Sequence, residues 1–131
     1  MTDSELRDEM DRVAELILSH RLTVNDEYEL QAALGDLLGG AGIAFEREKL
    51  LGEAGRIDFF LPVGSIGLET KVAGSPSEVL EQVIRYAHRP EISGLMLVTN
   101  KDSVARMVPD RLGPKESRKP VRVVSLWRTQ L

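Results

Sequence analysis

The sequence predicts an α/β protein in which a central mixed β-sheet is covered by helices. Three observations predict this class. Apolar residues recur at helical spacing in two segments, residues 3–20 and 25–38. The period then changes to two in three successive segments between residues 43 and 72. A further helix, a strand, a short helical segment and a last strand follow, which is the element order of a sheet with helices on its faces.

Length and composition narrow the class of protein. A chain of 131 residues, 42% hydrophobic and 29% charged, can bury one core and has no room for a second full domain. The absence of cysteine excludes disulfides, thiolate zinc sites and a cysteine nucleophile. The acidic start MTDSELRDEM is unlike a signal peptide, and no stretch approaches the roughly 20 apolar residues of a membrane span. We therefore expect a cytoplasmic protein that does not contact a membrane.

Charge is unevenly distributed along the chain. Residues 106–131 hold seven basic and two acidic side chains, a net charge of +5, although the whole chain carries −4. A basic C-terminal segment suggests contact with a polyanion such as nucleic acid. The alternative is an ordinary surface of mixed charge.

Each element has its own signal. The first helix has an apolar stripe and an acidic outer face, and the second has Thr23 or Asn25 as N-cap and Gly39-Gly40 as its end. Ser75-Pro76-Ser77-Glu78 is a capping box with proline at the first helical position. The expected elements after the second helix are strands at 43–46, 56–61 and 66–72, a helix from 75 to 87, a buried strand at 95–98, a short helix within 99–107, a loop at 109–120 and a strand at 121–126. We expect one domain, 1–131, with an N-terminal helix (3–20), a core (23–100) and a basic segment (106–131).

The strands at 56–61 and 66–72 are joined by a stretch short enough for a hairpin turn. Pairing of Leu61 with Ile66 would fix the register. It places Phe59 and Ile57 on one face, opposite Leu68 and Thr70. Charged residues occupy the other face, with Asp58 opposite Glu69 and Arg56 opposite Lys71.

This register sets two carboxylates against each other, with β-carbons about 5 Å apart, which is destabilising unless a proton or a cation intervenes. Magnesium is held by one or two carboxylates together with water and phosphate oxygens, so Asp58 and Glu69 suit it. Lys71 projects from the same face, where it would orient or deprotonate an attacking water or stabilise charge on a phosphate. Together these groups predict phosphodiester hydrolysis. The alternative is a solvated sheet face whose charges neutralise one another.

These residues resemble the PD-(D/E)XK nuclease superfamily. Arg56-Ile57-Asp58 and Glu69-Thr70-Lys71 match its pattern of an aspartate on the second strand and Glu-X-Lys on the third, with Ile57 in place of the proline. The resemblance covers residues 25–100 and implies a restriction-endonuclease-like core, α-βββ-α-β, with the residue 3–20 helix as an addition. It also implies Mg²⁺ or Mn²⁺ bound by Asp58 and Glu69, with the Thr70 backbone carbonyl as a further ligand.

The resemblance implies a further acidic ligand on the preceding helix. Glu27 shares a helical face with Leu30, Leu34 and Leu38, whereas Glu29 lies off this stripe, so Glu27 is expected to reach the metal. Glu48 is the reserve candidate. On the helix after Lys71, the family often carries a Gln-X-X-X-Tyr or Gln-X-X-Arg-Tyr pattern, which Gln82-Val83-Ile84-Arg85-Tyr86 matches.

For the other polar residues, the sequence gives weaker evidence of a functional role. Gln82 is expected to bond a catalytic group or a phosphate, and Arg85, Tyr86, Arg118 and Lys119 are candidates for nucleic-acid contacts. A helix surface with a half-buried tyrosine and a solvated basic loop are the alternatives. His20 and His88 lack a partner at metal-ligand spacing and are expected at helix ends on the surface. Trp127 is expected to pack on the core rather than to stack on a base.

The sequence thus predicts a metal-dependent nuclease acting on DNA, in which Glu27, Asp58 and Glu69 hold the metal and Lys71 serves the water. Two alternatives remain: an inactive nucleic-acid-binding module of the same fold, and an interaction subunit whose charged face is an interface. A homodimer would suit an enzyme that cuts two strands, although nothing in the sequence demands it.

Overall fold

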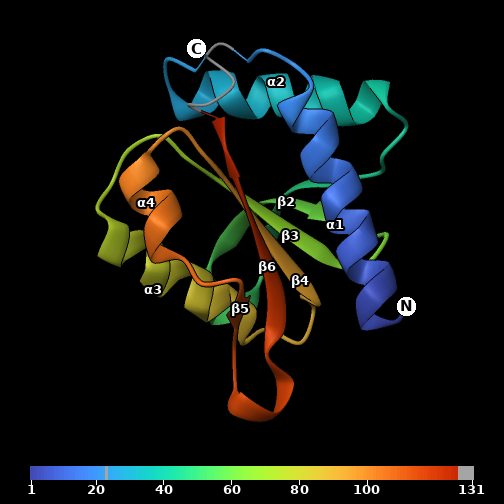
Figure 1. Cartoon of the computed structure of the whole chain (residues 1–131), viewed down its shortest axis with the longest axis vertical. Helices are drawn as coiled ribbons and strands as arrows, with labels where there is room; N and C mark the ends of the chain where they lie inside the picture. Colours follow the sequence, from blue (N-terminus) through green and yellow to red (C-terminus); the bar gives the residue numbers. More distant parts are fainter. Residues whose placement is uncertain (23, 127–131) are drawn as a thin grey trace.

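The computed structural model describes residues 1–22 and 24–126 and forms a mixed six-stranded sheet with four helices (Figure 1). The helices are α1 (Asp3–Leu18), α2 (Glu27–Gly40), α3 (Pro76–Ala87) and α4 (Asp102–Met107). The strands are β1 (Glu46–Leu50), β2 (Arg56–Leu61), β3 (Ile66–Lys71), β4 (Gly94–Thr99), β5 (Arg111–Leu112) and β6 (Lys119–Ser125), in the order β1-β2-β3-β4-β6-β5. The α/β class predicted from the sequence is confirmed at this level.

Strand direction changes across the sheet. β1, β2 and β3 are antiparallel neighbours, whereas β3, β4 and β6 run parallel and β5 is antiparallel to β6. β4 is buried along its whole length, as a strand covered on both faces should be. The expected register of the hairpin is confirmed, because Leu61 pairs with Ile66 and Phe59 with Leu68.

Helix ends follow local capping chemistry. The Thr2 and Glu5 side chains form a capping box at the start of α1, and Ser75 caps α3 ahead of Pro76. The cap of α2 was predicted wrongly: Asp26 accepts from the Glu29 amide at 2.8 Å, Asn25 bonds the Glu29 side chain, and Thr23 lies outside the described residues. Gly39 and Gly40 continue α2, and the left-handed residue that follows it is Gly42 (φ 73°).

Two apolar layers sandwich the sheet. α1 and α2 pack over one face, with Leu30, Leu34 and Phe59 fully buried there. α3 packs over the other face around Val83 and Tyr86, and α4 adds Val104 to a neighbouring cluster. Both layers remove large apolar side chains from water, which is the main source of stability for such a fold.

Several expected boundaries shift. The first strand begins at Glu46, the last residue of the expected strand 43–46, and α1 ends at Leu18 instead of residue 20. The segment 109–120 was predicted as a loop, but it includes β5 and a 3₁₀ turn at Lys115–Ser117, and β6 begins at Lys119. Among the residues that the structure describes, no helix is long and apolar enough to cross a membrane.

Candidate functional site

The site lies where β2 and β3 separate. Their backbone pairing runs from Leu61–Ile66 to Phe59–Leu68, and beyond that point side chains take its place. The Asp58 amide donates to Glu69 Oε1 at 3.1 Å, and the Thr70 amide donates to Asp58 Oδ2 at 2.8 Å. Each carboxylate therefore satisfies a backbone donor of the facing strand, and the two acids predicted to be neighbours are held together.

The other neighbour of β2 is also irregular at this point. β1 pairs Arg47 with Phe59 and Lys49 with Ile57, so Glu48 lies across from Asp58 with a left-handed φ of 51°. The side chains of β2 change face here. Ile57 joins the layer under α3 while Phe59 joins the layer under α2, so the prediction that both occupy one face is wrong. Glu48 is exposed on β1, and the Arg56 guanidinium bonds its carbonyl.

Glu69 is almost fully buried, with 2% of its surface exposed. Burial and, next, the charge of Asp58 raise the pKa of Glu69 to about 8, while Lys71 acts in the opposite direction. Lys71 Nζ lies 3.6 Å from Glu69 Oε2. Asp58, Glu69 and Lys71 therefore form one coupled charge cluster, in which the Lys71 ammonium lies beside the buried acid.

Glu27 reaches the same end of β3 from the first turn of α2. Its Oε1 accepts from the Val72 amide at 3.3 Å, directly after Lys71. Glu29 is exposed and bonded by Asn25. The face argument thus predicted correctly which of the two glutamates turns toward the sheet.

Gln31 and Arg47 also belong to this site, although no motif predicted a role for them. The Gln31 amide donates to Thr70 Oγ1 at 3.1 Å and accepts from Arg47 Nη2 at 2.6 Å, while Thr70 Oγ1 donates to Asp58 Oδ2 at 2.7 Å. Arg47 also stacks over the Phe59 ring, 4.5 Å from its centroid. One feature of the sequence could have predicted Gln31: it follows Glu27 by one helical turn, so both residues lie on one face of α2.

Gln82 and Tyr86 form a hydrogen-bonded pair on α3. Gln82 Nε2 donates to the Tyr86 hydroxyl at 2.9 Å, and this hydroxyl donates to the Arg56 carbonyl at 2.8 Å. Burial, followed by the charge of Glu69, raises the pKa of Tyr86 to about 12. Tyr86 is only 1% exposed, so the expected contact with nucleic acid is corrected: the ring lies in the core and ties α3 to β2.

A pocket of about 260 Å³ opens beside Lys71, between β3 and the first turns of α3. Gln82 and the exposed Arg85 line it, together with Gly74, whose carbonyl accepts from Lys101 Nζ at 3.1 Å. The cations Lys71 and Arg85 and the acid Glu78 line the pocket, and neither acid of the β2–β3 pair does. An anionic ligand would approach Lys71 from this side.

Arg118 and Lys119 lie at the other end of the sheet. Lys71 is level with Thr99 and Ser125 in the parallel strands, six residues along β6 from Lys119, or about 20 Å. Lys119 donates to the Arg89 carbonyl at 2.7 Å, and burial lowers its pKa. The structure therefore does not bring these two basic residues to the carboxylates. Figure 1 shows the β5–β6 hairpin at the end of the molecule away from α2.

His20 and His88 lie exposed at the ends of α1 and α3, each with Nδ1 near a backbone carbonyl of its helix, as predicted. Trp127 lies outside the described residues. Within residues 1–22 and 24–126, no three acidic or histidine side chains are close enough together to form a metal site by themselves. Comparison of the chain with family models, curated proteins and solved structures gives no match.

Proposed function

We propose that the chain is a metal-dependent nuclease that hydrolyses phosphodiester bonds in DNA, built on a core that resembles the PD-(D/E)XK superfamily. The order α2, β1 to β3, α3, β4 follows the helix, three strands, helix and strand that this resemblance implies. Glu27, Asp58, Glu69 and Lys71 come from three different elements and gather at one end of β3. This convergence supports the proposal more strongly than any one motif.

The reciprocal hydrogen bonds of Asp58 and Glu69 carry the proposal. Two acids held side by side cost stability through burial and repulsion, and the raised pKa of Glu69 expresses that cost. Perturbed acids beside a pocket are typical of functional sites. A surface network of compensating charges would not need Glu69 to be buried.

The donor chemistry fits Mg²⁺ or Mn²⁺. Both ions prefer carboxylate oxygens, and magnesium commonly uses one or two protein carboxylates with water and substrate phosphate completing the shell. Asp58 and Glu69 would hold the ion together with the Thr70 carbonyl. Glu27 would become a further ligand by leaving the Val72 amide and turning toward the two acids. A bound ion lowers the pKa of water and neutralises charge on the phosphate.

Side chains of the chain itself would orient the attacking water and bind the phosphate. Lys71 lies 3.6 Å from Glu69 and at the pocket, where its ammonium would orient the attacking water or donate to a phosphate oxygen. Arg85 and Gln82 line the same pocket and would contact the phosphate. Tyr86 holds Gln82 in place from the core.

The second candidate is a nucleic-acid-binding module without turnover. The burial of Glu69 favours it, because a pKa of about 8 leaves this residue largely protonated at neutral pH and so removes one charge that would repel phosphate. The cations around the pocket would then serve binding alone.

Cleavage of labelled single-stranded, duplex and four-way-junction DNA, with a matched RNA strand, tests the proposal. The unaltered chain is expected to cut at least one DNA form with Mg²⁺ or Mn²⁺ and none with a chelator, and Asp58→Asn is expected to cut none. Asp110→Asn, an exposed acid in the segment before β5, is the matched control. Binding without cutting would favour the module, and neither binding nor cutting would reject both candidates.

A further inference from the structure

The outer edge of β6 is open. β5 pairs with β6 through Arg111–Pro120 and Leu112–Lys119, and the Asp110 carbonyl just before β5 accepts from the Val121 amide. Among residues 1–22 and 24–126, no strand pairs with this edge between Arg122 and Ser125. Figure 1 looks onto β6, with α4 on one side of it, α1 on the other, and β5 beside only its first residues.

Peptide groups of β6 point out from this edge. The Val121 amide donates outward to the Asp110 carbonyl, and the Val123 carbonyl accepts from the Arg122 guanidinium at 2.9 Å. Because a strand repeats every two residues, the peptide groups of Val123 and Ser125 share this direction. The edge therefore presents a short template for another strand.

The opposite edge of the sheet is protected. β1 has the sequence Glu-Arg-Glu-Lys-Leu, and the left-handed Glu48 interrupts its regular geometry, both of which discourage pairing with another chain. The unpaired part of β6 has no left-handed residue, and its one charged side chain is Arg122, whose guanidinium a pairing strand would have to displace from the Val123 carbonyl. The two edges thus differ in the features that prevent association.

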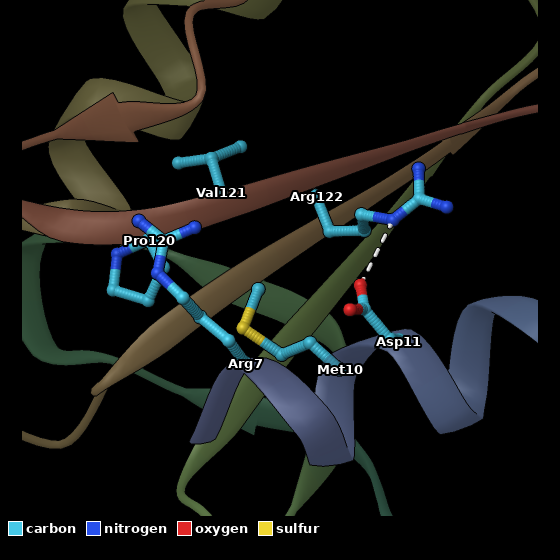
Figure 2. Close-up of a pocket in the computed structure, with 6 residues that line it drawn as sticks. All are labelled: Arg7, Met10, Asp11, Pro120, Val121 and Arg122. Carbon is cyan, nitrogen blue, oxygen red and sulfur yellow. Dashed lines mark hydrogen bonds and ion pairs between the residues drawn. The ribbon is translucent and has the colours of Figure 1, made fainter. Parts of the chain in front are cut away.

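Charges of both signs flank the open edge. Arg7 and Asp11 of α1 line a pocket of about 100 Å³ on one side, where Figure 2 shows the Arg122 guanidinium directed at Asp11. On the other side, Asp102 and Arg106 of α4 form an ion pair and line a hollow of about 590 Å³. α4 therefore offers an acid and a base along its axis beside the unpaired part of β6, whereas α1 is mainly acidic.

We propose that a second copy of this chain docks on the open edge, with β6 antiparallel to β6 of the partner copy. A two-fold axis through the edge sets α4 antiparallel to its counterpart, so Asp102 of each copy faces Arg106 of the other. A partner with charges of one sign would meet a like charge on α4 whichever sign it carried, which favours self-association. This inference does not depend on the nuclease proposal.

Charge-reversed variants test the pairing. In sedimentation equilibrium, the unaltered chain is expected to dimerise with rising concentration, while Asp102→Arg and Arg106→Asp each weaken the dimer roughly tenfold or more. An equimolar mixture of the two variants is expected to associate again, because two bases then face two acids. A chain that stays monomeric at every concentration, or a mixture that behaves like either variant alone, would overturn the proposal.

Hydrogen exchange locates the interface without a mutation. The amides of Val123 and Ser125 are expected to gain protection as concentration rises, whereas that of Val124, which faces β4, is protected throughout. Gain of protection along β1 instead, or none at all in a sample that sediments as a dimer, would contradict a β6 interface.

Discussion

Asp58 and Glu69 lock each other to the opposite strand: the Asp58 amide donates to Glu69 Oε1, and the Asp58 carboxylate accepts from the amide of Thr70, the residue after Glu69. The ladder between β2 and β3 ends one residue earlier, at Phe59 and Leu68. Carboxylates have thus replaced backbone acceptors at the opening of the sheet. The exchange satisfies both amides but brings two acids together, and a proton, Lys71 or a divalent cation relieves their repulsion.

The stability of the protein should depend on the charge of Glu69. Its pKa of about 8 lies above the ordinary 4.5, so the folded chain keeps a proton that the unfolded chain loses. Stability from this group is present below the unfolded pKa and falls as pH rises toward 8, by an amount on the order of a few kcal/mol. Glu69→Gln keeps an acceptor for the Asp58 amide and should lack this loss. Urea unfolding in chelator at about pH 5 and about pH 9 measures the difference. If the free energy of unfolding changes equally between the two pH values in the unaltered chain and in Glu69→Gln, Glu69 does not titrate in this way.

Divalent metal should stabilise the folded chain. Binding to the folded state alone adds about 2.7 kcal/mol when the free ion is at about one hundred times its Kd. We expect Mg²⁺ and Mn²⁺ to raise the midpoint of thermal unfolding, and Asp58→Asn to abolish this rise. The Asp110→Asn control should respond like the unaltered chain. Equal effects of metal on Asp58→Asn and the unaltered chain would place the ion elsewhere.

Gln31 should support Asp58 through Thr70. Gln31→Ala removes bonds to Thr70 and Arg47, and Thr70→Val removes the hydroxyl between Gln31 and Asp58. Each variant should lose about 1 kcal/mol of stability, and the double variant should lose less than the sum, because both changes break one network. Strict additivity in urea unfolding would show that the two side chains act independently.

The Tyr86 hydroxyl should serve the structure and not nucleic-acid contact. Tyr86→Phe removes the bond that orders the Gln82 amide and leaves the Arg56 carbonyl unpaired, at a cost of about 1–3 kcal/mol. DNA affinity should fall only slightly, because the Gln82 amide loses its ordering bond but stays at the pocket, whereas Arg85→Ala, which removes an exposed charge there, should weaken it more. Filter binding under chelator compares the two variants, and a loss of affinity in Tyr86→Phe equal to that in Arg85→Ala would contradict this division.

Much of the fold was predictable because local signals agreed with the tertiary structure. The apolar period marked the helices, and the short turn before Ile66 set the register of the hairpin. The same register argument failed at Ile57, since it assumed a regular strand and the left-handed Glu48 has no signal in the sequence.

The site was predicted in part for similar reasons. Glu27 could be chosen by its helical face, whereas the bonds of Gln31 join residues 39 and 16 positions away and depend on packing. The basic C-terminal segment was read as a phosphate contact from composition alone. Composition does not show that Lys119 lies at the far end of β6, where it bonds a carbonyl.

The most direct test of the central claim is the single-turnover rate of DNA cleavage by Lys71→Ala under saturating Mg²⁺. If Lys71 serves the water or the phosphate, the rate should fall by roughly 10²-fold or more at a DNA concentration that saturates the variant, while the variant stays folded at the assay temperature. The control is Lys115→Ala, which removes an exposed lysine from the far end of the sheet and should leave the rate unchanged. Cleavage by Lys71→Ala at the rate of the unaltered chain would contradict the proposed site.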